Sequence, residues 1–210
     1  MFISFEGIDG AGKTTLLSTM EAWLTKEKIA PIVTREPGGT RLGEKVRELL
    51  LDPSHTGMSD RAELLLYSAS RAQLVQEVIR PALDEGHWVL ADRFIDATLA
   101  YQGYGRGLDL KMLRAVQEWA TGGLWPHRTV LVDCDLDIAA GRQKLRPKAK
   151  DRIENEHRAF HRAVREGYLA LAEQEPERIT VIDGSKPLGE VLQDFEGVFW
   201  RPLLQNSNLE

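Results

Sequence analysis

Short apolar segments alternate with longer segments of helical periodicity along this chain of 210 residues. The short segments are continuously hydrophobic or β-branched, and each is followed by a polar or turn residue, a pattern typical of strands buried on both faces. The five expected strands cover residues 2–5, 31–34, 88–91, 129–132 and 179–182. Apolar residues at helical spacing predict helices over residues 13–27, 61–85, 158–174 and 188–199.

The alternation of strands and helices predicts an α/β fold in which a five-stranded parallel sheet carries helices on both faces. The sequence contains no internal repeat, no linker and no low-complexity tract. We therefore expect residues 1–210 to form a single domain.

Composition and charge narrow the range of functions. The formal net charge is -5, and a weakly acidic protein is a poor general binder of nucleic acid or of an anionic membrane. An anionic ligand would therefore need a local cluster of positive groups. The single cysteine, Cys134, excludes an internal disulfide and favours a reducing, cytoplasmic location. Neither a signal peptide nor a membrane span is expected from the sequence.

Residues 7–14 match the phosphate-binding pattern G-x-x-x-x-G-K-[ST] in full, between a predicted strand and a predicted helix. Glycines let backbone N–H groups approach phosphate oxygens, and the helix N-terminus adds further donors. Lys13 is expected to reach the β- and γ-phosphates of ATP, and the Thr14 hydroxyl to bind Mg²⁺. A glycine-rich turn without a ligand is the weaker alternative. The residues expected to bind ATP are Gly7, Ile8, Asp9, Gly10, Ala11, Gly12, Lys13, Thr14 and Thr15.

A second charged pair, Asp92 and Arg93, follows the expected strand at 88–91. An aspartate that ends a buried strand in such a protein can hold Mg²⁺, often through water. The guanidinium beside it would lie where two phosphate groups meet, and its planar fork matches phosphate oxygens. A helix-capping aspartate next to a surface arginine is the alternative. The presence of the Lys13 loop favours the functional interpretation.

Two further segments are candidates for an acceptor site. Arg35 follows the second strand within residues 34–40, where strand ends face the ligand crevice and Pro37 is a candidate for a cis peptide bond. Tyr67 and Arg71 lie four residues apart on one helix face, so they could stack a base and hold its phosphate. Without further evidence, a plain loop is an equal alternative for the first segment. A core tyrosine with an exposed arginine is the more common explanation of the second.

A basic segment at residues 141–152 is expected to form a short lid. From residue 142 to 152 it holds three arginines, three lysines and one aspartate, a local charge of +5. Such a loop can close over a triphosphate, exclude water and stabilise the transferring phosphoryl group. The phosphate loop itself has no arginine, so the lid is the expected source. The candidate residues are Arg142, Arg146 and Arg152. A solvated basic loop is the alternative.

Four segments in this order resemble the bacterial thymidylate kinases, and they span nearly the whole chain. They are residues 5–15 (FEGIDGAGKTT), 34–40 (TREPGGT), 92–103 (DRFIDATLAYQG) and 151–154 (DRIE). The resemblance implies a P-loop NTPase fold with a short basic lid, and transfer of the γ-phosphate of ATP to dTMP with Mg²⁺. It also implies a homodimer and a role in dTTP synthesis.

The resemblance also implies a role for individual residues. Asp9 would contact the 3′-hydroxyl of the acceptor sugar, and the ring at Tyr67 would stack on thymine, although the family usually has phenylalanine there. Thr98 and Gln102 would read the base edge, and Tyr101 would crowd the 2′ position of the sugar. Arg47 would lie near the base. The residues implied to bind the acceptor phosphate are Arg35, Arg71 and Arg93.

The phosphate of a nucleoside monophosphate is largely dianionic near neutral pH, so its attack needs no general base. Two rivals remain. Another P-loop kinase is one, and a deoxynucleoside kinase would need a carboxylate base such as Glu36 or Asp92. A regulatory P-loop switch is the other, but the Asn-Lys-x-Asp motif of guanine-specific switches does not occur in the sequence.

Overall fold

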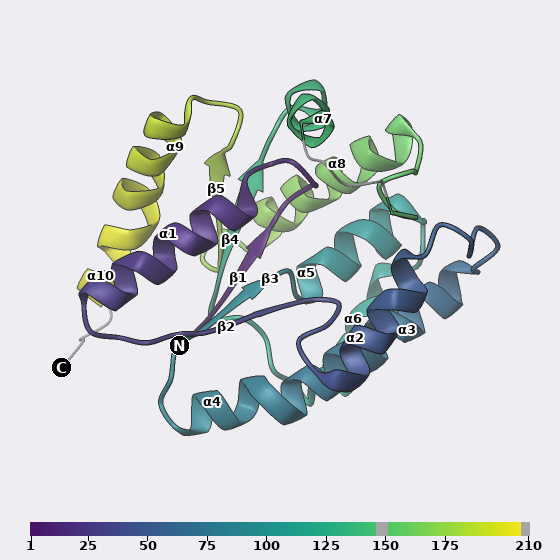
Figure 1. The fold of residues 1–210 in the computed structure, drawn as a ribbon, viewed down its shortest axis with the longest axis horizontal. Coiled ribbons are helices and arrows are strands. Elements are labelled where there is room, and N and C mark those ends of the chain that lie inside the picture. Colours follow the sequence, from purple (N-terminus) through teal and green to yellow (C-terminus); the bar gives the residue numbers. More distant parts are fainter. Residues whose placement is uncertain (146–150, 207–210) are drawn as a thin grey trace.

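A five-stranded parallel sheet forms the centre of the computed structural model, which describes residues 1–145 and 151–206 (Figure 1). The strand order is β2-β3-β1-β4-β5. The strands are β1 (Phe2–Glu6), β2 (Ile32–Arg35), β3 (Val89–Asp92), β4 (Arg128–Asp133) and β5 (Ile179–Asp183). The predicted fold class is confirmed.

All five predicted strands are present, and each ends one residue later than expected. The charged residue that was expected to close each strand still pairs in the ladder: Arg35 lies opposite Asp92, and Asp133 opposite Asp183. The expectation that every strand is buried on both faces was wrong for the two edges. Val33 in β2 is 42% exposed and Val181 in β5 is 43% exposed, because an edge strand is covered less completely than the central strands.

Helices cover both faces of the sheet (Figure 1). On one side lie α1 (Lys13–Lys26) and α9 (Leu188–Phe195), with α10 (Arg201–Asn206) after the π-helical turn η3 (Glu196–Trp200). On the other side lies α3 (Asp60–Leu74), which continues through η1 (Val75–Ile79) into α4 (Arg80–Asp84) and corresponds to the helix predicted over residues 61–85. The predicted helix α8 (Arg158–Gln174) lies on the same side. The sequence pattern did not reveal the remaining helical elements, which are α2 (Arg41–Leu51), α5 (Ile95–Thr98), η2 (Leu99–Gly105), α6 (Leu110–Thr121) and α7 (Leu136–Lys144).

Aromatic packing fixes α1, the helix that follows the phosphate loop, against the C-terminal helices. The ring of Trp23 stacks on Phe195 with centroids 5.2 Å apart, and it lies 5.7 Å from Trp200. Burial of such rings is among the larger apolar contributions to stability. On its inner face α1 buries Leu16, Met20 and Leu24 against the sheet. The position of the loop before α1 is therefore set by the core. In the described part of the chain, no helix has the length and apolar character needed to cross a bilayer.

Candidate active site

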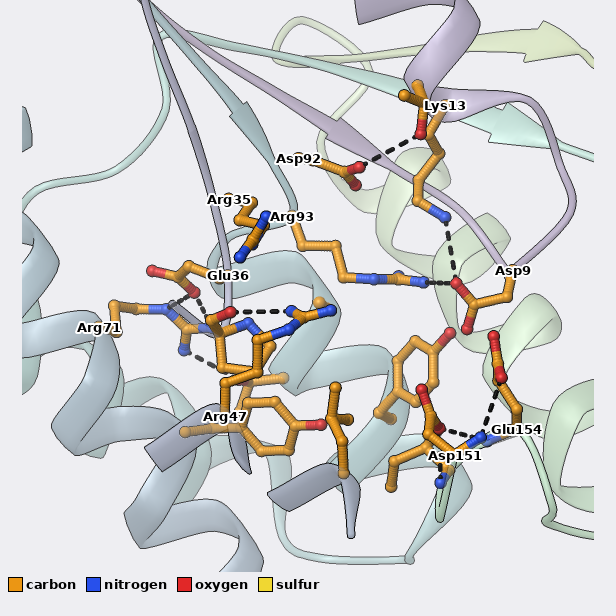
Figure 2. Close-up of a pocket in the computed structure, with 18 of the residues that line it drawn as sticks. Asp9, Lys13, Arg35, Glu36, Arg47, Arg71, Asp92, Arg93, Asp151 and Glu154 are labelled. Carbon is orange, nitrogen blue, oxygen red and sulfur yellow. Dashed lines mark hydrogen bonds and ion pairs between the residues drawn. The ribbon is translucent and has the colours of Figure 1, made fainter. Parts of the chain in front are cut away.

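A cavity of about 220 Å³ opens beside the turn between β1 and α1, at the carboxyl end of β3 (Figure 2). Most of the residues expected to bind a donor or an acceptor line it. They are Asp9, Gly10, Gly12, Lys13, Thr14, Arg35, Tyr67, Arg71, Asp92, Arg93, Thr98, Tyr101 and Gln102. The remaining loop residues Gly7, Ile8, Ala11 and Thr15 do not line it.

The phosphate loop depends on glycine for its shape. Gly7, Gly10 and Gly12 have φ angles of 135°, 88° and 114°, which other residues rarely adopt. A β-carbon at Gly7 would lie 2.3 Å from the carbonyl oxygen of Val132. Helix α1 begins directly after Gly12, so its unpaired N–H groups face the cavity end of the loop.

Replacing Gly7 by alanine is expected to destabilise the fold by about 2 kcal/mol or more and to weaken ATP binding at least about tenfold. The reason is that the new methyl group meets backbone that cannot yield, in a conformation unfavourable for alanine. Thermal unfolding and ATP titration measure the two effects. Gly189→Ala is the matched control, because a β-carbon at this exposed α9 position meets nothing within 4 Å; its stability should change by less than about 1 kcal/mol. Equal behaviour of the two variants would contradict the prediction.

Lys13 and Asp9 form the centre of the loop. The Lys13 side chain is 7% exposed, and its ammonium donates to the carbonyl oxygen of Ile8 at 3.0 Å and lies 3.7 Å from Asp9 Oδ1. Burial and the nearby Arg93 lower the pKa of Lys13, although Asp9 opposes them. Burial alone would raise the pKa of Asp9, but Arg93 and Lys13 hold it well below the usual range. Asp9 is therefore a carboxylate that can only accept hydrogen bonds.

Asp92 and Thr14 lie together at the mouth of the loop. The Thr14 hydroxyl is 3.5 Å from Asp92 Oδ2, and both residues line the cavity. Among the described residues, no cluster of three or more His, Cys, Asp or Glu side chains could hold a metal ion. A hydroxyl and one carboxylate suit Mg²⁺, which keeps waters and phosphate oxygens as its other ligands.

Arg93 lies between the two ends of the cavity (Figure 2). Its guanidinium donates to the carbonyl oxygen of Gly7 at 2.8 Å, to Asp9 Oδ1 at 2.8 Å and to the Tyr168 hydroxyl at 3.1 Å. It also stacks over the ring of Tyr101 at 5.0 Å. The arginine has a φ of 74°, in the left-handed region, which strains a residue with a β-carbon. The alternative of a freely exposed surface arginine is thereby excluded.

Behind Arg93 lies a buried carboxyl group that the sequence did not single out. Glu6 accepts hydrogen bonds from the backbone N–H of Phe94 at 2.6 Å and from the Tyr168 hydroxyl at 2.8 Å. Burial, with the negative charge of Asp96, raises the pKa of Glu6 to about 8. Glu6 therefore supports Arg93 indirectly, through Tyr168.

Arg71 is buried, so the alternative of an exposed arginine on this helix is excluded. It is 1% exposed, and it stacks over Phe94 at 5.4 Å. Its guanidinium donates to four acceptors from different segments, which are Glu36, Thr98, Gln117 and the carbonyl oxygen of Phe94. Burial raises the pKa of Glu36, although Arg71 opposes this effect, and one oxygen of Glu36 has no partner among the described residues. Arg71 therefore places a buried positive charge in the wall of the cavity.

Arg35 and Tyr67 both line the cavity. Arg35 is largely exposed and donates to both carboxylate oxygens of Glu44 at 2.9 and 3.0 Å. Tyr67 is half-buried, and its burial raises the pKa of its hydroxyl. The peptide bond between Glu36 and Pro37 is cis, which confirms the prediction for that loop.

Two lid arginines lie in the described part of the chain, and only one of them, Arg142, contacts the phosphate loop. Arg142 lies behind the loop and donates to the carbonyl oxygens of Gly184 at 2.8 Å and Ala11 at 3.2 Å. Arg152 is 8% exposed and turned the other way, where it donates to the carbonyl oxygen of Leu50 and pairs with Glu63 at 2.7 Å. Arg146 lies outside the described residues.

Comparison with known proteins connects this geometry to a family. A family model described as thymidylate kinase matches residues 5–195. The chain belongs to the thymidylate kinase family.

Curated thymidylate kinases from several bacteria are similar to the chain over most of its length. The thymidylate kinase of Deinococcus radiodurans is 52% identical over 192 residues, which cover 91% of this chain and 92% of that protein. That of Desulfovibrio desulfuricans is 50% identical over 198 residues, covering 91% of each chain. Thymidylate kinase family membership makes the chain an ATP-dependent kinase, so the regulatory switch is excluded.

Sequence reasoning considered Glu36 only as a base in a rival kinase and Pro37 only as a candidate for a cis peptide bond, yet both line the cavity. It missed five further lining residues, which are Leu51, Ala97, Asp151, Ile153 and Glu154. Arg47, expected near the base, also lines it and donates to the carbonyl oxygen of Pro37 at 2.8 Å. Leu51 ends the unpredicted helix α2, whose Thr40 cap and apolar Val46 and Leu50 could have revealed it.

Proposed function

We propose that the chain transfers the γ-phosphate of ATP to dTMP, giving dTDP and ADP for dTTP synthesis. The observation that carries this proposal is the shared cavity, in which the Lys13 loop and a wall of polar and aromatic residues face each other across Arg93. The names of the bacterial relatives support dTMP as the acceptor.

Catalysis then consists of bringing two anionic nucleotides together in line. Lys13 would hold the β- and γ-phosphates, and Arg93 would lie between donor and acceptor phosphates. Asp9, already ionised, would accept a hydrogen bond from the 3′-hydroxyl of the acceptor. The acceptor phosphate is the nucleophile in its dianionic form, so no residue has to remove a proton. Thr14 and Asp92 would hold Mg²⁺, which neutralises phosphate charge when bound.

The other arginines divide into two groups. Arg35 can leave Glu44 for the acceptor phosphate at little cost, because exposed ion pairs contribute only about 0–1 kcal/mol. Arg71 has its donors occupied by buried protein groups, so we assign it to holding Glu36 and Thr98 in the wall and to supplying positive charge there. Arg152 is buried, pairs with Glu63 and does not line the cavity, so it is the weaker lid candidate. For the lid we therefore retain Arg142 and Arg146 as candidates.

A substrate panel tests the proposal. Purified protein with MgATP is given dTMP, dUMP, CMP, AMP or thymidine, and ADP release is followed with a coupled assay. We expect the highest kcat/KM with dTMP and no turnover with thymidine. Preferred turnover of thymidine would indicate a nucleoside kinase, and preferred turnover of CMP or AMP would indicate a different monophosphate kinase.

We also propose that two copies of the chain associate through α2, α3 and α6. Helix α3 packs against both α2 and α6, and all three helices carry large exposed apolar side chains. The side chains are Leu42, Leu49, Leu65, Met112 and Trp119. Trp119 is 87% exposed, and several such residues on adjacent helices indicate a protein interface. A cytoplasmic homodimer without nucleic-acid or membrane partners remains our expectation.

Trp119→Ser is expected to shift the dimer toward monomer, with a dissociation constant raised at least about tenfold, because a large aromatic side chain buried at an interface contributes strongly to binding. Sedimentation velocity over a range of concentrations measures the shift. Leu188→Ser is the control, because Leu188 is also exposed, at 58%, but lies on α9 across the sheet. A monomeric wild type, or an unchanged dimer in Trp119→Ser, would contradict the proposed interface.

A further inference from the structure

Glu63 on α3 is a buried carboxylate at which three segments of the site meet. It is 1% exposed. It accepts from Gln102 at 2.8 Å, from Arg106 at 3.1 and 3.2 Å, and pairs with Arg152 at 2.7 Å. Burial alone would raise the pKa of Glu63, but hydrogen bonds from Arg106 and Gln102 lower it below the usual value. Glu63 is therefore ionised at neutral pH.

An ionised carboxylate constrains the neighbouring amide because it can only accept hydrogen bonds. The Nε2 group of Gln102 must therefore face Glu63, as the structure has it. The amide oxygen is turned away from Glu63, and no described residue donates to it. Gln102 is 2% exposed and lines the cavity at its acceptor end. The polar atom that Gln102 has available for a bound base is thus an acceptor.

We propose that Glu63 is a positioning residue that sets the base preference of the acceptor site by fixing the amide of Gln102. The proposal rests on the proposed dTMP kinase function. Thymine and uracil carry an N–H donor at N3, which an amide oxygen can accept. Cytosine carries a lone pair at N3, so two acceptors would face each other in a buried site. Leaving such groups unpaired discriminates between substrates by one or more factors of ten.

A purely structural role for Glu63 makes a different prediction. If Glu63 only joined Arg106 and Arg152, its loss would lower stability and reduce turnover of all acceptors in similar proportion. A positioning role changes the ratio of kcat/KM for dTMP to kcat/KM for dCMP. The ratio is therefore the quantity that separates the two roles.

The first test variant is Glu63→Gln. A neutral amide at this position can donate or accept, so it no longer dictates which end of Gln102 faces the cavity. We expect the dTMP to dCMP ratio to fall about tenfold or more. Glu156→Gln is the matched control, because Glu156 also pairs with Arg106, at 2.7 Å, and no described hydrogen bond joins it to Gln102. The ratio in this control should stay within about twofold of wild type.

The second test variant exchanges the two groups, Glu63→Gln with Gln102→Glu. It keeps one carboxylate and one amide in the cluster, so it preserves the charge that Arg106 and Arg152 need. The carboxylate at position 102 offers only acceptors, and we expect the ratio to return to within about threefold of wild type. A collapsed ratio in the double variant would overturn the proposal even if Glu63→Gln alone does not fold.

The outcomes separate the inference from the function on which it rests. Wild-type protein that makes no dTDP from dTMP and ATP would overturn the proposed function. Active wild type with an unchanged ratio in Glu63→Gln would overturn only the role of Glu63. A collapsed ratio in the double variant would also overturn it, because that result would mean that the base is read by the amide N–H groups of Gln102.

Discussion

Replacing Lys13 by alanine is expected to lower kcat by on the order of 10³-fold or more at saturating MgATP, with the fold retained. Lys13 is buried at the end of the loop, and its ammonium is already directed at the carbonyl oxygen of Ile8 and at Asp9. Its charge is therefore fixed before a nucleotide arrives and needs no reorganisation during transfer. Asp9 keeps Arg93 as a partner in the variant, so no carboxylate is left without a counter-charge.

A coupled ADP-release assay and a thermal melt measure the two parts of this prediction. Lys26→Ala is the matched control, because it removes a lysine from the last turn of the same helix, where the side chain is exposed. We expect the control to keep wild-type turnover and both variants to unfold within a few degrees of wild type. Turnover near the wild-type rate in Lys13→Ala at saturating MgATP would remove Lys13 from the mechanism.

The sheet could be predicted from the sequence because its strands are continuous apolar or β-branched segments and each is closed by a charged residue. Helices α2 and α6 were missed although local signals for them are present in the sequence. Helix α2 follows the Thr40 cap and buries Val46 and Leu50, and α6 follows the Asp109 cap and buries Leu113. Helix α5 and η2 are almost entirely buried, so they have little polar periodicity to detect. Helix α5 and η2 depend on tertiary contacts, which a local pattern does not contain.

The part of the cavity that we propose binds the donor was predictable because it lies in one continuous motif, residues 7–14. The part that we propose binds the acceptor was predictable only in part. Arg71 has the sequence context of an exposed helical arginine, and its burial depends on Glu36, Thr98 and Gln117, which are 27 to 46 residues away. The contact between Gln102 and Glu63 likewise joins residues 39 positions apart. Spacing along one chain could not reveal such pairs.

The second large effect is expected at Arg93. Arg93→Lys should lower kcat by on the order of 10²-fold, while KM for ATP and for the acceptor changes less than about fivefold. A lysine keeps the positive charge but cannot donate in one plane to Gly7 and Asp9, as the guanidinium does. The loss therefore falls on the transition state, in which charge develops between the two nucleotides, more than on binding of either one.

Steady-state kinetics with each substrate varied in turn measures this separation of kcat from KM. Arg114→Lys is the control, because it makes the same exchange at an arginine whose partner is Glu175 and which does not line the cavity. The left-handed backbone at Arg93 costs about 1–3 kcal/mol in any residue with a β-carbon, and lysine bears the same cost. The substitution therefore tests the guanidinium alone. An effect confined to KM would mean that Arg93 contributes only to substrate binding. The strained backbone would then position a side chain that binds phosphate, and not one that acts during transfer.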